Sequence, residues 1–245
     1  MSGWGERYSG LWAMLVGLAL LAGGYWFWSA LRRNPPLAVV AARPGRMQSF
    51  WLPDSSFFLL QGESQILYPV RGFGTRLRQI ALQGQAYVEV RPGKTPLRIR
   101  CDSLYVDVSG PAVGNIRWRY GRLELTVVSG RFLLRAPDGH QWILEDWQRI
   151  VWPQPAHIET RSPFPYIQWR FGWLYFFQTP LYEVLDELRR SWDLRLEADS
   201  SLLYRPVSAT FSPDQTYAEA LDQLAARLRA RVVPVEDGWR LEGEE

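Results

Sequence analysis

The sequence predicts a single N-terminal transmembrane helix, an all-β sandwich or solenoid-like domain, and a small α/β domain built from a βαβ repeat. Three observations indicate this arrangement. An uncharged and largely apolar stretch runs from Leu11 to Leu31. Residues 47–152 show the alternation of apolar and polar residues that is typical of strands. Residues 169–245 instead combine short strand patterns with two stretches of helical spacing.

The stretch from Leu11 to Leu31 is long enough to cross a bilayer. A helix rises about 1.5 Å per residue, and the hydrocarbon core of a membrane is about 30 Å thick. A signal peptide cleaved near Ala22 is the alternative. The aromatic cluster at residues 25–28 favours an uncleaved anchor, because such residues prefer the membrane interface, and Arg32 and Arg33 follow the span.

The composition divides the chain into five segments. Repeated prolines mark the connecting segments, because proline supplies no backbone donor to a helix or a sheet. We assign residues 1–33 to a short tail and the anchor, 34–46 to a linker, 47–152 to the all-β domain, 153–168 to a proline-rich linker and 169–245 to the α/β domain.

Strands of the β domain are predicted where apolar residues alternate, as in Leu97–Cys101, Leu104–Val108 and Leu123–Val127. Turn-forming residues separate these runs, and glycine allows the backbone to turn sharply. We therefore expect turns at several dipeptides, including Gln83–Gly84, Gly110–Pro111 and Ser129–Gly130.

The α/β domain begins with a run that predicts a buried strand, Trp173–Phe177. A helix should follow, with Thr179 as its N-cap and Pro180 at its first position. A second helix should begin at a capping box formed by Thr216 and Glu219. The apolar faces of the two helices are predicted from residues at helical spacing: Leu181, Val184, Leu185 and Leu188 in the first, and Leu221, Leu224, Ala225 and Leu228 in the second.

Little in the sequence indicates catalysis. His140 and His157 have no metal-ligand partners at suitable spacing, and Cys101 lies on the apolar face of a predicted strand. We expect no catalytic residues, no metal and no cofactor. A net charge of +3 with scattered arginines also argues against a nucleic-acid partner. The sequence therefore favours a binding or signalling module over an enzyme.

Several motifs of the β region resemble, in order, the signature of FecR-family periplasmic domains. The central one is the strand pair from Arg78 to Val90, followed by the Thr-Pro strand start at residues 95–99. Further resemblance lies in residues 53–56, 66–69 and 123–130. The family's usual Gly-Thr strand appears here with Pro111, where we expect a sheet edge or a bulge.

The C-terminal region also carries family motifs, at residues 169–176 and 179–185. They resemble the small domain that ends many FecR-type proteins and is akin to the short N-terminal domain of secretins and TonB-dependent receptors. The resemblance implies a regulator of the anti-sigma type. Its partners would be the signalling domain of an outer-membrane TonB-dependent receptor, the lipid bilayer and an extracytoplasmic-function sigma factor. About ten residues precede the span, fewer than the family's sigma-binding segment, so contact with the sigma factor is expected directly or through another protein.

The resemblance implies an inner-membrane protein with its C-terminal body in the periplasm. The positive-inside rule favours the opposite orientation, because Arg32, Arg33, Arg43 and Arg46 follow the span. We give precedence to the family resemblance. A structural or scaffold subunit of a cell-envelope complex is the alternative function.

Candidate partner-binding residues are Tyr182, Arg189 and Arg190, which lie off the apolar stripe of the first predicted helix. Aromatic and arginine side chains are enriched at protein interfaces. We expect these three side chains to be exposed. The carboxylates Glu183, Asp186 and Glu187 of the same helix are expected to form a solvated face.

Overall fold

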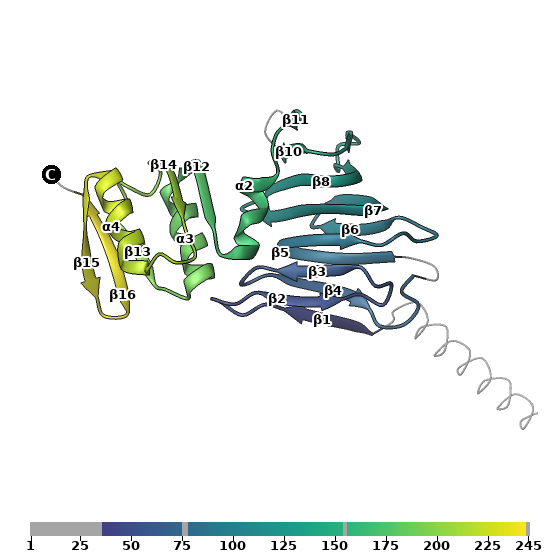
Figure 1. The fold of residues 1–245 in the computed structure, drawn as a ribbon, viewed down its shortest axis with the longest axis horizontal. Coiled ribbons are helices and arrows are strands. Elements are labelled where there is room, and N and C mark those ends of the chain that lie inside the picture. Colours follow the sequence, from purple (N-terminus) through teal and green to yellow (C-terminus); the bar gives the residue numbers. More distant parts are fainter. Residues whose placement is uncertain (1–35, 75–77, 154–155, 244–245) are drawn as a thin grey trace, which may run out of the picture.

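The computed structural model describes residues 36–74, 78–153 and 156–243, which form two bodies that lie side by side (Figure 1). The larger body is the β domain and the smaller one is the α/β domain. The predicted anchor at residues 11–31 lies outside the described residues. Among the residues that are described, no helix is long and apolar enough to cross a membrane.

The β domain consists of strands that are joined into one extended sheet and folded into two layers. One layer contains β2, β3, β10, β11 and halves of three long strands, and the other contains β1, β4, β6, β9 and the remaining halves. The strands are β1 (Leu37–Ala41), β2 (Gln48–Trp51), β3 (Phe57–Leu60), β4 (Gln65–Pro69), β5 (Arg78–Val90), β6 (Leu97–Cys101), β7 (Leu104–Arg119), β8 (Arg122–Arg135), β9 (Gln141–Leu144), β10 (Gln148–Trp152) and β11 (Glu159–Thr160).

The three long strands β5, β7 and β8 pass from one layer to the other at glycines. β5 pairs with β4 and β6 before Gly84, and with β3 and β7 from Gly84 onward. The register of β7 shifts between Ser109 and Val113, where Pro111 lies, so the expected bulge is confirmed. The turns expected at Gly84, Gly110 and Gly130 are wrong, since each glycine lies inside a continuous strand.

Sterics explain why Gly84 can serve as a corner. Its φ is +95°, in the left-handed region that side chains rarely adopt. A Cβ atom there would lie 2.4 Å from the Oγ of Ser64. The same is true of Gly130, where φ is +90° and a Cβ atom would lie 2.6 Å from that of Ala112. A dipeptide that contains glycine can therefore mark a bend within a strand as well as a turn between two strands.

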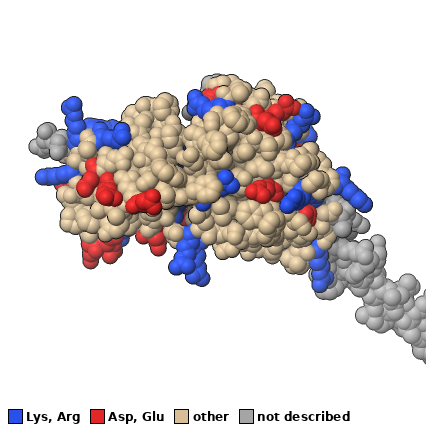
Figure 2. Space-filling view, in the orientation of Figure 1, with Lys and Arg blue, Asp and Glu red and all other residues tan. Residues whose placement is uncertain are grey.

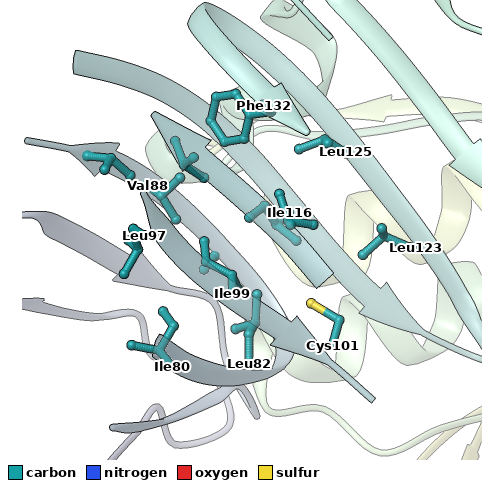
Figure 3. Packing of buried hydrophobic residues seen from close by; sticks show 14 of the residues in the cluster. Ile80, Leu82, Val88, Leu97, Ile99, Cys101, Ile116, Leu123, Leu125 and Phe132 are labelled. Carbon is teal, nitrogen blue, oxygen red and sulfur yellow. The ribbon is translucent and has the colours of Figure 1, made fainter. Parts of the chain in front are cut away.

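Apolar side chains from both layers fill the space between them (Figure 3). Phe58, Ile99, Ile116 and Phe132 are fully buried there. Cys101 belongs to this core, and burial raises the pKa of its thiol to about 12. The expectation that Cys101 packs is confirmed by its full burial.

Motif residues converge on the buried guanidinium of Arg78, whose side chain is 2% exposed. Its Nε and Nη2 donate to Oδ2 of Asp54 at 2.8 and 2.6 Å. Further N–H groups donate to the carbonyl oxygens of Thr95 and Arg91, both at 2.9 Å. Together with a longer hydrogen bond to Ser56 Oγ at 3.4 Å, these contacts compensate for the loss of water around this charge. The arginine joins the segments of the signature that lie far apart in the sequence.

The α/β domain contains two helices between two small sheets (Figure 1). The first strands of its two halves pair with each other, and β13, β15 and β16 form the second sheet. The halves therefore interleave instead of forming separate βαβ units. The elements are α2 (Phe164–Ile167), the 3-10 helix η1 (Gln168–Phe171), β12 (Leu174–Pro180), α3 (Leu181–Trp192), β13 (Leu196–Ala198), β14 (Pro206–Phe211), α4 (Tyr217–Leu228), β15 (Ala230–Val235) and β16 (Gly238–Gly243).

The capping box of α4 is confirmed, because Thr216 Oγ1 accepts from the N–H of Glu219, and the Glu219 carboxylate accepts from the N–H of Thr216. The cap expected for α3 is wrong. Pro180 is its N-cap, with extended backbone (φ −55°, ψ 140°), and Thr179 is still part of β12. Proline has no side-chain oxygen that could accept from the first N–H groups of the helix, so α3 begins without a polar cap.

Both predicted linkers contribute regular structure. β1, at residues 37–41, pairs with β4, and β11 pairs with β10. The segment 164–171 forms α2 and η1. The prolines in these segments do not prevent short strands at a sheet edge, because a missing backbone N–H donor is tolerated there.

The Arg78 cluster can be tested by substitution. We expect Arg78→Met to lower the free energy of unfolding by about 3–5 kcal/mol, because it leaves Asp54 and two carbonyls without their donor. The measurement is urea unfolding of the wild type and the variant. Arg131→Met is the matched control, since the Arg131–Glu145 pair is 65% and 57% exposed and should contribute about 0–1 kcal/mol. Equal effects of the two substitutions would contradict a special role for Arg78.

Candidate functional site

The helix α3 lies against the outer face of β7 and β8, and the contact is made largely by charged groups. In β7, Ile116 points into the β core, so the alternation of a strand turns Arg117 and Arg119 to the opposite face. From α3, Glu183 and Glu187 face this surface and are only 2% and 6% exposed. We call this contact the α3 interface.

One group of ion pairs in the α3 interface surrounds Glu124. This carboxylate accepts from Arg117 at 2.7 Å and from Arg149 at 2.9 Å. Burial alone would raise the pKa of Glu124, but the charges of Arg117, Arg149 and Arg122 lower it to about 2. Arg122 also donates to Glu183 of α3 at 2.7 Å, so this group bridges the two domains.

A second group surrounds the end of α3. Arg189 donates to Glu63, in the loop between β3 and β4, at 2.7 Å, and to Asp186 at 2.9 Å. The hydrogen bond from Arg189 is the main cause that lowers the pKa of Glu63. Arg190 contacts the same Glu63 carboxylate at 3.3 Å and donates to the hydroxyl of Tyr120 at 3.3 Å.

The backbone of two loops approaches the end of α3 closely. The N–H of Gly45 donates to the carbonyl oxygen of Arg190 at 2.8 Å. A Cβ atom on Gly62 would lie 2.4 Å from that same oxygen. A side chain at position 62 would therefore push α3 away from the β domain, so the close docking depends on this glycine.

The predicted partner-binding residues all lie at the α3 interface or beside it. Arg189 and Arg190 form the ion pairs described above, and the ring of Tyr182 packs edge-on against Tyr120, with 5.7 Å between the centroids. The expectation that all three side chains are exposed is wrong, since Tyr182 is half-buried and the Arg190 side chain is only 9% exposed. Whether they bind a separate protein stays a prediction.

The solvated carboxylate face expected for this helix is also wrong. Glu183 and Glu187 are buried because α3 covers the β domain with one side while its apolar side covers its own core. The sequence contains a signal that could have indicated this. Glu124 lies at an outward position of the predicted strand Leu123–Val127, and Arg117 and Arg122 are close to it in the sequence, so this region carries charges that can pair with those of a helix.

Next to the α3 interface, a cleft of about 360 Å³ separates β12 from the outer face of β7, β8 and β10. We call it the β12 cleft. Asn115, Arg149, Arg161, Tyr166 and Trp169 form its far wall. Trp169 Nε1 donates to the Asn115 side chain at 2.9 Å, and Arg149 lies 4.3 Å from the Tyr166 ring centroid, so this wall is fixed by its own contacts.

The chemistry of these surfaces suits protein recognition. Within the described residues, no group of three His, Cys, Asp or Glu side chains could hold a metal ion. The charged groups form ion pairs with one another. On the face shown in Figure 2, acidic and basic side chains are scattered and intermixed.

Comparison with known proteins places this geometry in a family. Residues 38–132 match the model of the FecR protein family. Two crystal structures, each of a proposed anti-sigma factor from Parabacteroides distasonis, share the fold with TM-scores of 0.78 and 0.77 at 18% identity. They cover 86% and 85% of this chain and 100% of their own chains, so the likeness extends beyond the β domain. No curated protein matches the sequence significantly. Residues 38–132 therefore carry a FecR domain, which confirms the resemblance indicated by the motifs of that region.

Proposed function

We propose that this protein is a signal-transducing regulator of the anti-sigma type. The FecR domain at residues 38–132 supports this, and so does the likeness of the whole described fold to proposed anti-sigma factors. Proteins of the FecR family act as regulators, which favours regulation over catalysis. We further propose an inner-membrane location with the body in the periplasm, where the protein relays the state of an outer-membrane TonB-dependent receptor towards a sigma factor.

The observation that carries this proposal is the docking of the α/β domain through buried ion pairs. Two domains on a flexible linker would move independently, so the binding of a partner to one domain would not change the position of the other. Here Arg122 pairs with Glu183 and Arg117 lies near Glu187, and both carboxylates of α3 are buried. The half-exposed pair Arg189–Glu63 adds a second attachment. Breaking a buried pair leaves a charge without its partner, which is costly. A partner that binds and moves the α/β domain can therefore also move the FecR domain, as the relay of a signal requires.

Deletion of the gene in its native host tests the proposal. A regulator of this type should change the transcript levels of one coherent set of genes, and a plasmid copy should restore them. The scaffold alternative gives a different result: unchanged transcripts, together with loss of an envelope complex from the membrane fraction. That result would overturn the regulatory proposal.

Docking can be disrupted at Gly62 without altering the core of either domain. We expect Gly62→Val to separate α3 from the loop that contains Glu63, because a side chain there collides with the Arg190 carbonyl. Amide hydrogen exchange of α3 should become faster, and complementation of the deletion strain should be lost. Gly243→Val is the control, since the nearest atom to a Cβ at that site is 3.9 Å away. Normal complementation by a Gly62→Val protein with fast exchange would show that docking is not needed for the function.

The proposed location makes a separate prediction. Alkaline phosphatase folds into an active enzyme only outside the cytoplasm, so a fusion after Glu245 should be active, and a β-galactosidase fusion at the same position should be inactive. The reverse pattern would place the C-terminal body in the cytoplasm, as the arginines after the predicted span favour.

A further inference from the structure

One edge of the strand β12 is paired in a sheet, and the other edge is unpaired and faces the β12 cleft. On one side it pairs with β14, from Leu174 to Pro180. On the other side, no strand within the described part of the chain pairs with it, and residues 173–180 line the cleft. Figure 1 shows β12 on the side of the α/β domain that faces the β domain. An edge of this kind offers backbone donors and acceptors to an incoming strand.

The side chains along β12 alternate between core and solvent. Leu174 and Phe176 are 4% and 7% exposed, whereas Trp173, Tyr175 and Phe177 are 38%, 42% and 64% exposed. The sequence run was expected to be a buried strand, and this row of exposed aromatic residues contradicts that expectation. Edge strands that must stay unpaired usually carry charges or proline to prevent association. The row on β12 lacks that protection until Pro180.

Arginines outnumber carboxylates by four to three in the lining of the β12 cleft. The side chain of Arg161 is 51% exposed and that of Arg122 is 26% exposed. The carboxylates of Glu124 and Glu187 are only 14% and 8% exposed and lie against arginines. Glu159, 32% exposed, is the most exposed carboxylate of the lining, and it lies 3.6 Å from Arg161. The guanidinium of Arg161 is therefore the most exposed of these charges to an approaching chain.

We propose that the β12 cleft binds an extended segment of a partner protein, which adds as a strand to the free edge of β12. The segment would carry acidic side chains for the arginines at the rim and apolar ones for the row of Tyr175 and Phe177. Main-chain hydrogen bonds would supply affinity, and the alternating side chains would supply specificity, as in other cases of strand addition. This mode of binding does not depend on the identity of the partner in the proposed function.

A defined peptide tests this inference on the full-length protein in detergent micelles. The probe is a fluorescent seven-residue peptide of alternating valine and glutamate, compared with a valine–lysine peptide of the same length. Anisotropy should show that the glutamate peptide binds at least about tenfold more tightly, as expected for electrostatic complementarity. Amide hydrogen exchange should show that saturation with this peptide protects residues 174–177 of β12.

Two variants with matched controls locate the site. We expect Phe177→Asp to weaken binding of the glutamate peptide by at least about tenfold, because it removes an apolar contact and adds a repelling charge. Ile143→Asp, on β9 of the other layer and 54% exposed, should leave binding unchanged. Arg161→Glu should weaken binding, whereas Arg131→Glu, at a 65% exposed arginine that pairs with Glu145, should not.

Several results would overturn the inference. They are the absence of binding by the glutamate peptide at millimolar concentration, equal affinity of the two peptides, and protection of a segment other than β12. Unchanged binding by Phe177→Asp would overturn it as well, provided that the thermal unfolding of this variant matches that of the wild type. These results leave the gene-deletion test of the proposed function unaffected, so the two proposals can fail separately.

Discussion

The arrangement of this molecule depends on charges that are buried between α3 and the β domain. Removing a charge from water costs several kcal/mol, and only close partners in good geometry compensate for that cost. Glu183 meets Arg122 at 2.7 Å, and Glu187 lies 3.9 Å from Arg117. A small slip of the helix along β7 would separate both pairs at once. An apolar interface tolerates such slips, because many packings bury a similar area. The ion pairs therefore fix the register of one domain on the other, which is the best-attested use of buried polar groups.

This interface exists because each layer of the β domain has an inner face, which forms the core, and an outer face. The corner at Gly84 lets β5 contribute to both layers, so each layer covers the other and their inner faces form one core. The outer face of the layer containing β3, β7 and β8 is then free to receive a second domain. Tyr87 of that face belongs to the core of the α/β domain, together with Phe176 and Phe211. Apolar contacts at Tyr87 and charged contacts at α3 thus join the two domains at neighbouring places.

Much of the fold could be predicted from the sequence, because local patterns determine it. The alternation at Leu97–Cys101 and the capping box at Thr216 correspond to β6 and to the start of α4. The corner at Gly84 could not be predicted, because a glycine that bends a strand and one that ends it have the same local sequence. The burial of Glu183 could not be predicted either. A helix that is apolar on one side and charged on the other resembles a surface helix until its docking partner is known.

The same docking explains why β12 keeps a free edge. The ion pairs of α3 hold the α/β domain at a fixed distance from the outer face of β7 and β8, and the segment from Tyr166 to Trp169 spans the end of the gap. β12 faces this gap, so it cannot pair with the β domain without breaking the contacts of α3. A small sheet of two strands gains stability from a third strand. The charges that fix the register of the domains thus also leave one strand edge unsatisfied. A chain added at that edge would stabilise the docked arrangement, because it would contact both domains.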